Sequence, residues 1–144
     1  MPQADFYVLN GVRKSGRFTA SITSKAWLHG NSVYIIAKDA HQAEVIDDFL
    51  WTYHDISFLP HSKIDDVDSK SPVTIGWSGS DSADADIIIN LTDSVPDCVK
   101  NYKRIIEIII DDPDEKNRGR QRYKVYRDMG FEMKNHNIDS FKDD

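Results

Sequence analysis

A run of cations in the last third of the chain contains the residues with the clearest binding chemistry. The segment KNRGRQRYKVYR, residues 116–127, has six basic residues and no acidic one. Four of its residues follow the spacing i, i+3, i+4 and i+7, so in a helix they share one face: Arg120, Tyr123, Lys124 and Arg127. That face would offer three cations around one aromatic ring, which suits an acidic peptide that carries an apolar side chain.

Two other uses compete for these cations. A charge run usually forms a solvated face that balances nearby acids, but no acid separates the cations within this segment, so we expect them to remain for a partner. Phosphates of nucleic acid would also suit them. The whole chain has a net charge of −6, and without these six positive charges the remainder carries −12. Direct binding of single-stranded DNA would therefore be weak without a helping protein. On a different face, Val125, Tyr126 and Met129 are expected to pack on a sheet.

An acidic cluster just before this segment is the strongest signal for an enzyme. Asp111, Asp112, Asp114 and Glu115 follow an apolar segment, and α/β enzymes often place carboxylates at the end of a strand. The simpler interpretation is that they cap the next helix and favour its start through the helix dipole. The alternative is a small nucleotide- or metal-dependent α/β enzyme that uses the Asp111/Asp112 strand end.

Other motifs for catalysis or ligand binding do not stand out. The chain has no GxxxxGK[ST] and no GxGxxG between a strand and a helix, and its five histidines show no HExxH spacing. Cys98 has no base at a recognisable spacing, so it is not expected to be a nucleophile. We therefore predict no catalytic residue, no metal and no cofactor.

Apolar segments that alternate with amphipathic ones must position these residues. The pattern predicts one α/β domain over residues 1–144, a three-layer α/β/α arrangement with a mainly parallel central sheet. Strands are expected at 5–9, 32–38, 72–77, 86–91 and 103–110, and helices at 18–29, 40–53 (capped by Asp39) and 114–129. The tail from 131 is expected to add an edge strand before an acidic frayed end from about 137. The polar stretches 61–71 and 78–86 are predicted to be loops.

Composition sets the limits of this interpretation. A chain of 144 residues with 40% apolar and 29% charged residues suits one soluble domain. No run approaches the roughly 18 apolar residues needed to cross a bilayer, and the start does not resemble a signal peptide. The single Cys98 cannot form an internal disulfide, which fits a reducing cytoplasm.

The stretch FLWTYHDISFLPH, residues 49–61, holds an unusual number of large rings. On a helical wheel four residues of the 40–53 helix are expected to meet the sheet: Ala43, Ile46, Leu50 and Tyr53. Trp51 points about 100° or more away from the middle of that face. Phe58 follows in a loop that could fold back beside Trp51, so we predict that these two rings face a protein partner. Burial of both rings in the core is the alternative.

Several segments, taken in order, resemble the chi subunit family of the bacterial DNA polymerase III holoenzyme. They are FYVL near the start, the Trp27 helix leading into VYIIAKD, HQAEVIDDFLW, SFLPH, PVTIGW, DIIINL, RIIEII and RQRYKVYRDMGF. The resemblance covers nearly the whole chain. It implies a cytoplasmic bacterial protein of DNA replication, a clamp-loader accessory subunit without polymerase activity of its own, in a holoenzyme with DNA-directed DNA polymerase activity.

The resemblance also implies partners. One surface of the family binds the acidic, Phe-ended C-terminal tail of single-stranded-DNA-binding protein, and by match to the motif it falls on Arg120, Tyr123 and Lys124. A second surface, matched by Trp51 and Phe58, binds the psi subunit, which tethers chi to the clamp loader. An XPD-like helicase can occupy this surface in place of psi. Contact with DNA would then be mainly indirect, and no membrane is involved.

Two residues depart from the family pattern. Gly119 stands where the family usually has Ala, which costs a helix interior about 1 kcal/mol, so the helix is expected to begin later or to flex at its first turn. Gln121 replaces a usual Glu, which makes the segment more positive and should not weaken anion binding.

Overall fold

A computed structural model describes residues 2–11, 15–52, 61–63, 72–78, 84–97 and 99–139. Seven strands form one sheet in the order β3-β4-β2-β5-β6-β1-β7, and every neighbouring pair is parallel. The strands are β1 (Gln3–Leu9), β2 (Val33–Ala37), β3 (His61–Lys63), β4 (Val73–Trp77), β5 (Ile87–Asn90), β6 (Arg104–Ile109) and β7 (Glu132–Ile138). The helices are α1 (Gly16–Leu28), α2 (Ala40–Thr52) and α3 (Pro113–Asp128), with a short 3-10 turn η2 (Val99–Asn101).

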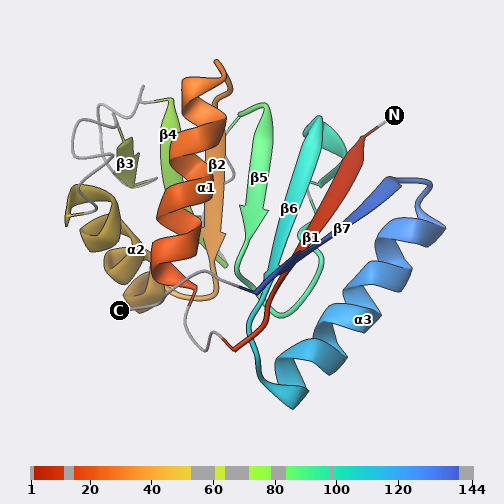
Figure 1. The fold of residues 1–144 in the computed structure, drawn as a ribbon. Coiled ribbons are helices and arrows are strands. Elements are labelled where there is room, and N and C mark those ends of the chain that lie inside the picture. The colour runs from red at the N-terminus through yellow and green to blue at the C-terminus, as the bar shows by residue number, and fades with distance from the viewer. Residues whose placement is uncertain are drawn as a thin grey trace.

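Helices cover both faces of the sheet, so the predicted three-layer α/β/α fold with a parallel sheet is confirmed (Figure 1). The α1 and α2 helices pack on one face, where Phe18, Ile46 and Leu50 join the isoleucines of the central strands. The α3 helix covers the other face through Tyr126. Parallel strands with helices on both sides are apolar along their length, as the sequences VYIIA, IIIN and RIIEII show.

Strand β1 illustrates how one element serves both layers. Successive side chains of a strand point to opposite faces. Tyr7 and Leu9 accordingly pack on the side of α1, whereas Ala4 and Phe6 pack on the side of α3. The strand lies between β6 and β7, in register with both, although these two strands follow it by about a hundred residues. The C-terminal third of the chain is therefore built around the first strand.

The observed elements agree with those expected from the sequence to within a few residues, with one difference. His61–Lys63 forms β3, which pairs with β4 at the sheet edge, so the prediction of a loop over all of 61–71 is wrong. The tail adds the expected edge strand as β7, which ends at Ile138, and residues 140–144 lie outside the described part of the chain. No helix among the described residues combines the length and apolar character needed to cross a bilayer.

Candidate functional site

The start of α3 is fixed by the acidic cluster. Asp112 is the N-cap, and its side chain accepts a hydrogen bond from the backbone N–H of Glu115 at 3.0 Å, with Pro113 in the first turn. Asp111 accepts from the backbone N–H of Gly11 at 3.2 Å and lies 3.0 Å from the Nζ of Lys116. This arrangement confirms the capping interpretation of the cluster. Within the described ranges, no group of three or more His, Cys, Asp or Glu side chains could hold a metal.

The face of α3 that packs on the sheet differs in part from the expectation. Gly119, Arg122 and Tyr126 are its buried residues. Tyr126 is fully buried and Met129 packs partly against the same cluster, as expected, but Val125 is 44% exposed. The expectation for Val125 was wrong because an arginine takes the inward position between Gly119 and Tyr126.

Arg122 is buried because it meets a buried carboxylate on β6. Its Nε donates to Glu107 at 2.9 Å, and the Glu107 side chain is fully buried. Tyr126 Oη and Asn90 Nδ2 also donate to Glu107, at 2.6 and 2.7 Å. Burial raises the pKa of Glu107, while the charge of Arg122 and these hydrogen bonds oppose the rise. With three donors around one carboxylate, the network holds α3 in one position on the sheet.

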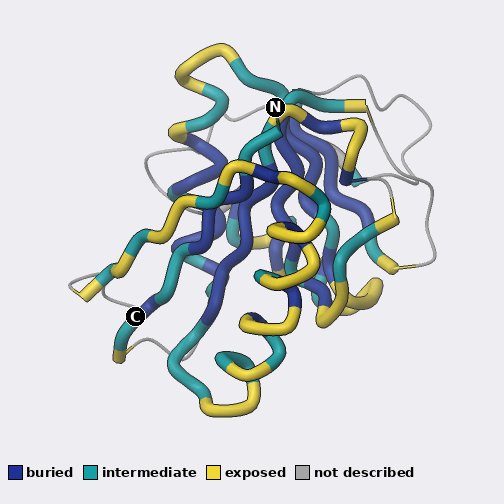
Figure 2. Tube along the Cα trace, turned by 90° about the vertical axis from the view of Figure 1, so that its right-hand side faces the viewer, coloured by how far each residue is buried: buried dark blue, intermediate teal, exposed yellow. Residues whose placement is uncertain are grey.

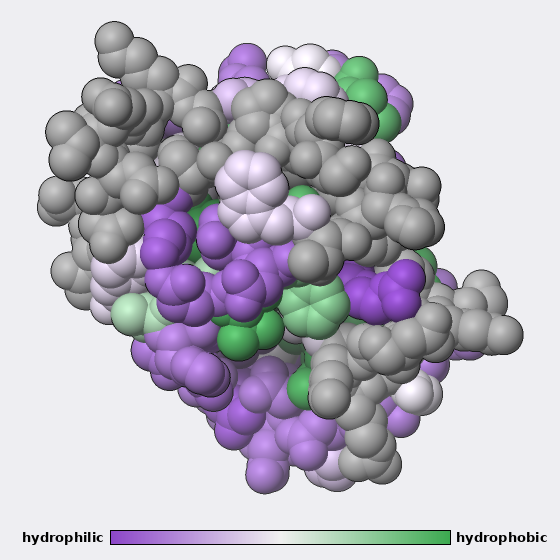
Figure 3. Space-filling model, turned by 90° about the vertical axis from the view of Figure 1, so that its left-hand side faces the viewer, coloured by the Kyte–Doolittle hydropathy of each residue, from purple (hydrophilic) through white to green (hydrophobic). Residues whose placement is uncertain are grey.

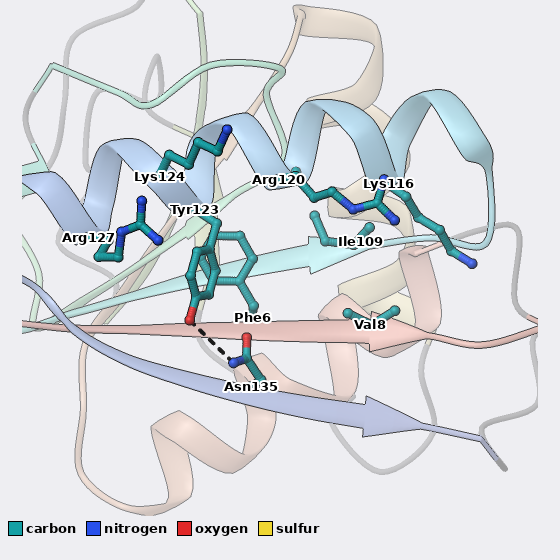
Figure 4. Close-up of a pocket in the computed structure, with 10 residues that line it drawn as sticks. Phe6, Val8, Ile109, Lys116, Arg120, Tyr123, Lys124, Arg127 and Asn135 are labelled. Carbon is teal, nitrogen blue, oxygen red and sulfur yellow. Dashed lines mark hydrogen bonds between the residues drawn. The ribbon is translucent and has the colours of Figure 1, made fainter.

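The outer side of α3 borders a cavity of about 510 Å³, here called the α3 cleft. Its lining comes from four elements: Phe6 and Val8 of β1, Ile109 of β6, Asn135 of β7, and Lys116, Gly119, Arg120, Tyr123, Lys124 and Arg127 of α3. Figure 4 shows the cationic side chains along the helix, above the apolar floor formed by the strands. All four residues predicted to share a face therefore line one cavity.

Tyr123 forms a wall of the α3 cleft. Its ring meets Phe6 edge to face with the centroids 5.1 Å apart, and Asn135 Nδ2 lies 3.5 Å from its hydroxyl group (Figure 4). The ring is only partly buried, so one side of it stays available to a ligand. An aromatic wall beside apolar strand residues suits an apolar side chain, in particular a ring.

The expectation that the basic segment lacks partners holds for some of its cations only. Arg118 is paired with Glu115 and Asp93, and Lys116 is paired with Asp111. Arg127 lies 3.9 Å from its neighbour Asp128, and both side chains are exposed. Arg120 and Lys124 are exposed and form no ion pair with any residue in the described part of the chain. The expectation was incomplete because the acids that pair lie just outside the segment: Glu115 and Asp128 on α3 itself, Asp111 directly before it and Asp93 after β5.

Gly119 has a structural reason in this chain. A Cβ at this position would lie 2.7 Å from Cδ1 of Ile109, so α3 lies close to β6 here and an Ala would require the Ile109 side chain to shift. The helix begins at Pro113 and continues through Gly119, so the expectation of a later start is wrong. Both residues line the α3 cleft, and the missing methyl group leaves its floor deeper.

The second predicted surface lies at the end of α2, on another side of the molecule. Ala43, Ile46 and Leu50 are buried, as expected, and Trp51 is 59% exposed. Tyr53 and Phe58 lie outside the described residues, so their predicted places are not tested. Figure 3 shows the side of the molecule that carries α2 and β3, where the coloured surface is mostly hydrophilic with small apolar spots between.

Sequence reasoning missed the residues of the α3 cleft that come from the strands. Phe6, Val8, Ile109 and Asn135 join the helix only through the strand order and register. One feature of the sequence could have predicted the burial of Arg122. The single Glu of RIIEII lies in a strand whose other central residues are apolar, and a buried carboxylate requires a buried partner.

Comparison with known proteins identifies the family. The family described as "DNA polymerase III chi subunit, HolC" matches residues 1–134. The chain belongs to this family. Members are accessory subunits of DNA polymerase III in DNA replication.

Three chi subunits match this chain over almost their whole length. The chi subunit of Pseudomonas aeruginosa is 30% identical over 140 residues, which cover 96% of this chain and 98% of the relative. The Escherichia coli subunit is 29% identical, with 92% and 96% covered, and the Haemophilus influenzae subunit is 28% identical, with 94% and 96% covered.

Solved structures show that the fold is shared more widely. T4 UvsW has a TM-score of 0.65 at 10% identity, with 95% of this chain covered. A DEAD box protein from Methanococcus jannaschii has a TM-score of 0.54 at 16% identity, with 94% covered. The chain spans about 41% of each of those structures, and at this identity the likeness concerns the fold alone.

Proposed function

We propose that this chi-family chain is an adaptor that binds the acidic C-terminal tail of single-stranded-DNA-binding protein in the α3 cleft. Arg120, Lys124 and Arg127 attract the carboxylates, and the apolar end of the tail packs between Tyr123 and the strand residues. The chain carries no catalytic role in this proposal. It links the DNA-coating protein to the replication machinery.

The observation that carries the proposal is the combination of an apolar floor with cations that have no ion-pair partner among the described residues. A solvated charged face would balance its own charges, as Arg118 does with Glu115 and Asp93. In the part of the chain that the structure describes, Arg120 and Lys124 form no such pair, and both line a cavity of about 510 Å³. A cavity with an apolar interior and a few charged groups at its rim is typical of a ligand site.

The second part of the proposal concerns Trp51 and Phe58, through which the chain would bind the psi subunit, and thus the clamp loader, or an XPD-like helicase. The exposure of Trp51 supports this, because an exposed Trp is costly to leave uncovered and Trp is enriched at binding hot spots. Replacing both rings by Ala should abolish partner binding and leave the unfolding transition cooperative. Loss of the fold in this double variant would instead support the alternative that both rings are buried in the core.

The test of the α3 cleft is a titration with a fluorescent peptide that ends in Asp-Asp-Asp-Ile-Pro-Phe. Arg120→Ala and Lys124→Ala should each weaken binding about tenfold, the typical effect of losing a charge-assisted hydrogen bond. Lys100→Ala is the matched control, because Lys100 is an exposed cation that does not line the cleft. Equal affinities of Arg120→Ala and wild type would remove the assignment of this site.

Two further conditions separate the electrostatic and apolar contributions to binding. Raising the ionic strength from 0.05 to 0.5 M should weaken binding of the peptide, because exposed charges are screened. A peptide without the final Phe should bind weakly at both ionic strengths, because the floor of the cleft then stays empty. Unchanged affinity after removal of the Phe would show that the cleft is not occupied.

A further inference from the structure

The outer side of β7 is an open sheet edge. The strand is the last in the sheet order, and β1 is its one pairing partner among the described strands. The N–H of Glu132 donates to Pro2 and the C=O of Ile138 accepts from Asn10, both at 3.0 Å. In a parallel pair the backbone groups of alternate residues face the neighbour, so those of 133, 135 and 137 point outward. Asn135 and Asn137 are exposed, and no backbone partner for them occurs among the described residues.

This open edge runs beside the α3 cleft. Asn135 and Asn137 align with Phe6 and Val8, the two β1 residues that line the cleft. Asn135 lines the cleft itself, and Figure 4 shows it between the edge strand and Tyr123. Figure 2 faces this side of the molecule and shows β7 and the outer turns of α3 exposed in front of the buried strands. A ligand that leaves the cleft sideways therefore meets backbone donors and acceptors that have no partner in the described part of the chain.

Cations lie on both faces of the edge. A strand added to β7 would send its side chains alternately to the two faces of the sheet. On one face they would approach the α3 side, where Lys124 and Arg127 are exposed. On the other face lie Lys134, which is exposed, and His136, which stacks on Tyr7 and contacts the buried Asp5. Exposed Glu132 shares this second face with Lys134, so the α3 side is the one that favours an acidic strand. A second copy of this chain would instead bring the cations of the α3 side together.

We propose that the acidic peptide extends the sheet, pairing its backbone with the outer edge of β7 while its apolar end lies in the α3 cleft. The inference rests on the proposed function, and adds how the ligand is held. The backbone hydrogen bonds supply affinity that does not depend on side chains, and the cleft and flanking cations select an acidic segment with an apolar end. An acidic segment that cannot become extended is bound weakly.

The experiment uses wild-type protein and a set of peptides ending in Asp-Asp-Asp-Ile-Pro-Phe. Each peptide carries one methyl group, on the backbone nitrogen of one of the three Asp residues or of the Ile. Only alternate peptide N–H groups of an added strand face β7. Methylation should therefore weaken binding about tenfold at every second position and have little effect in between. On the protein side, Asn137→Pro removes an outward N–H and should weaken binding by a similar factor, because Pro is tolerated where the N–H of an edge strand faces solvent. Asn137→Ala keeps the N–H and is the matched control.

The outcomes separate this proposal from the proposed function. If every methylated peptide binds as the parent does while Arg120→Ala still weakens binding, strand addition is overturned and the cleft assignment remains. If Arg120→Ala has no effect either, both are overturned. If Asn137→Pro does not fold, the peptide series decides alone, since it needs only wild-type protein. A concentration-dependent dimer that the acidic peptide cannot dissociate would assign the edge to a second copy and overturn the proposal.

Discussion

Two arginines two residues apart on α3 have opposite environments. Arg122 is buried and donates to Glu107 at 2.9 Å. Arg120 is exposed at the rim of the α3 cleft, without an ion-pair partner among the described residues. At about 100° per residue, two positions lie about 200° apart on the helix. One side of the same helix therefore fixes it to the sheet, and the other side is left for recognition.

The difference shows what each charge costs the fold. Removing Arg122 and Glu107 from water carries a desolvation penalty that their attraction only roughly offsets, so the pair specifies where α3 lies more than it adds net stability. Arg120 and Lys124 stay hydrated and cost the fold little. Their charges can be satisfied when an acidic ligand arrives. A rigid inner face makes the outer face a preformed site, which reduces the loss of freedom on binding.

The largest effect is expected from breaking the buried pair. Glu107→Leu leaves Arg122 buried without a counter-charge and should lower the free energy of unfolding by about 3–5 kcal/mol. Urea denaturation followed by circular dichroism measures the change. The double variant Glu107→Leu/Arg122→Met should recover part of it, because no buried charge remains.

The matched control for the buried pair is Arg120→Met, on the exposed face. It should change the free energy of unfolding by less than about 0.5 kcal/mol, as surface substitutions usually do. Equal destabilisation by Arg120→Met and Glu107→Leu would contradict the division of α3 into two faces.

The two tyrosines of α3 repeat the comparison with a smaller effect. The hydroxyl of buried Tyr126 donates to Glu107 at 2.6 Å, and burial together with the Glu107 charge raises the pKa of Tyr126. Tyr126→Phe should cost about 1.5–3 kcal/mol of unfolding free energy, the range for a hydrogen bond to a charged group. Tyr123→Phe should cost less than about 0.5 kcal/mol, since its hydroxyl has only a 3.5 Å contact with Asn135. Thermal and urea unfolding of both variants test this order, and a reversed order would contradict it.

Gly119 lies between the two faces of α3, so Gly119→Ala should have a small effect on both stability and peptide binding. Ala favours the helix by about 1 kcal/mol, but its Cβ would lie 2.7 Å from Cδ1 of Ile109, the end of a side chain that can move. The two effects should leave the free energy of unfolding within about 1 kcal/mol of wild type. Binding of the acidic peptide should weaken a few-fold, because the floor of the α3 cleft becomes shallower. Fluorescence titration and urea denaturation of the same sample measure both, and tighter binding would show that the floor does not contact the ligand.

The contrast between the two faces of α3 also explains which features could be predicted from the sequence. The cations of one helix face could be predicted to lie together, because helical spacing is local and regular. The fold class followed from the alternation of apolar segments such as VYIIA and IIIN. The partner of Arg122 could not be assigned, because Glu107 reaches it through the packing of α3 on β6. The three-residue β3 was missed because it is too short and polar to show a strand pattern. The strand residues that line the cleft could not be predicted either. They come together only because β1 lies between β6 and β7, and no local sequence pattern specifies that order.

The smallest effect is expected from a carboxylate that is neither buried like Glu107 nor, like Arg120, without an ion-pair partner among the described residues. Asp86 accepts from the backbone N–H of Ser32 at 3.0 Å and lies 3.6 Å from Nζ of Lys103. The hydrogen bond from Ser32, and then the charge of Lys103, hold the pKa of Asp86 below its usual value. A lowered pKa in the folded state means that the contribution to stability is present above about pH 4, the pKa in the unfolded chain, and is lost as the pH falls through the folded-state pKa.

Between pH 5 and pH 2.5 wild type should therefore lose more unfolding free energy than Asp86→Asn. The difference should be at most about 1 kcal/mol, since the side chain is 34% exposed and solvent screens it. Urea denaturation at several pH values measures it, and parallel pH dependence of the two proteins would place Asp86 with the solvated surface charges.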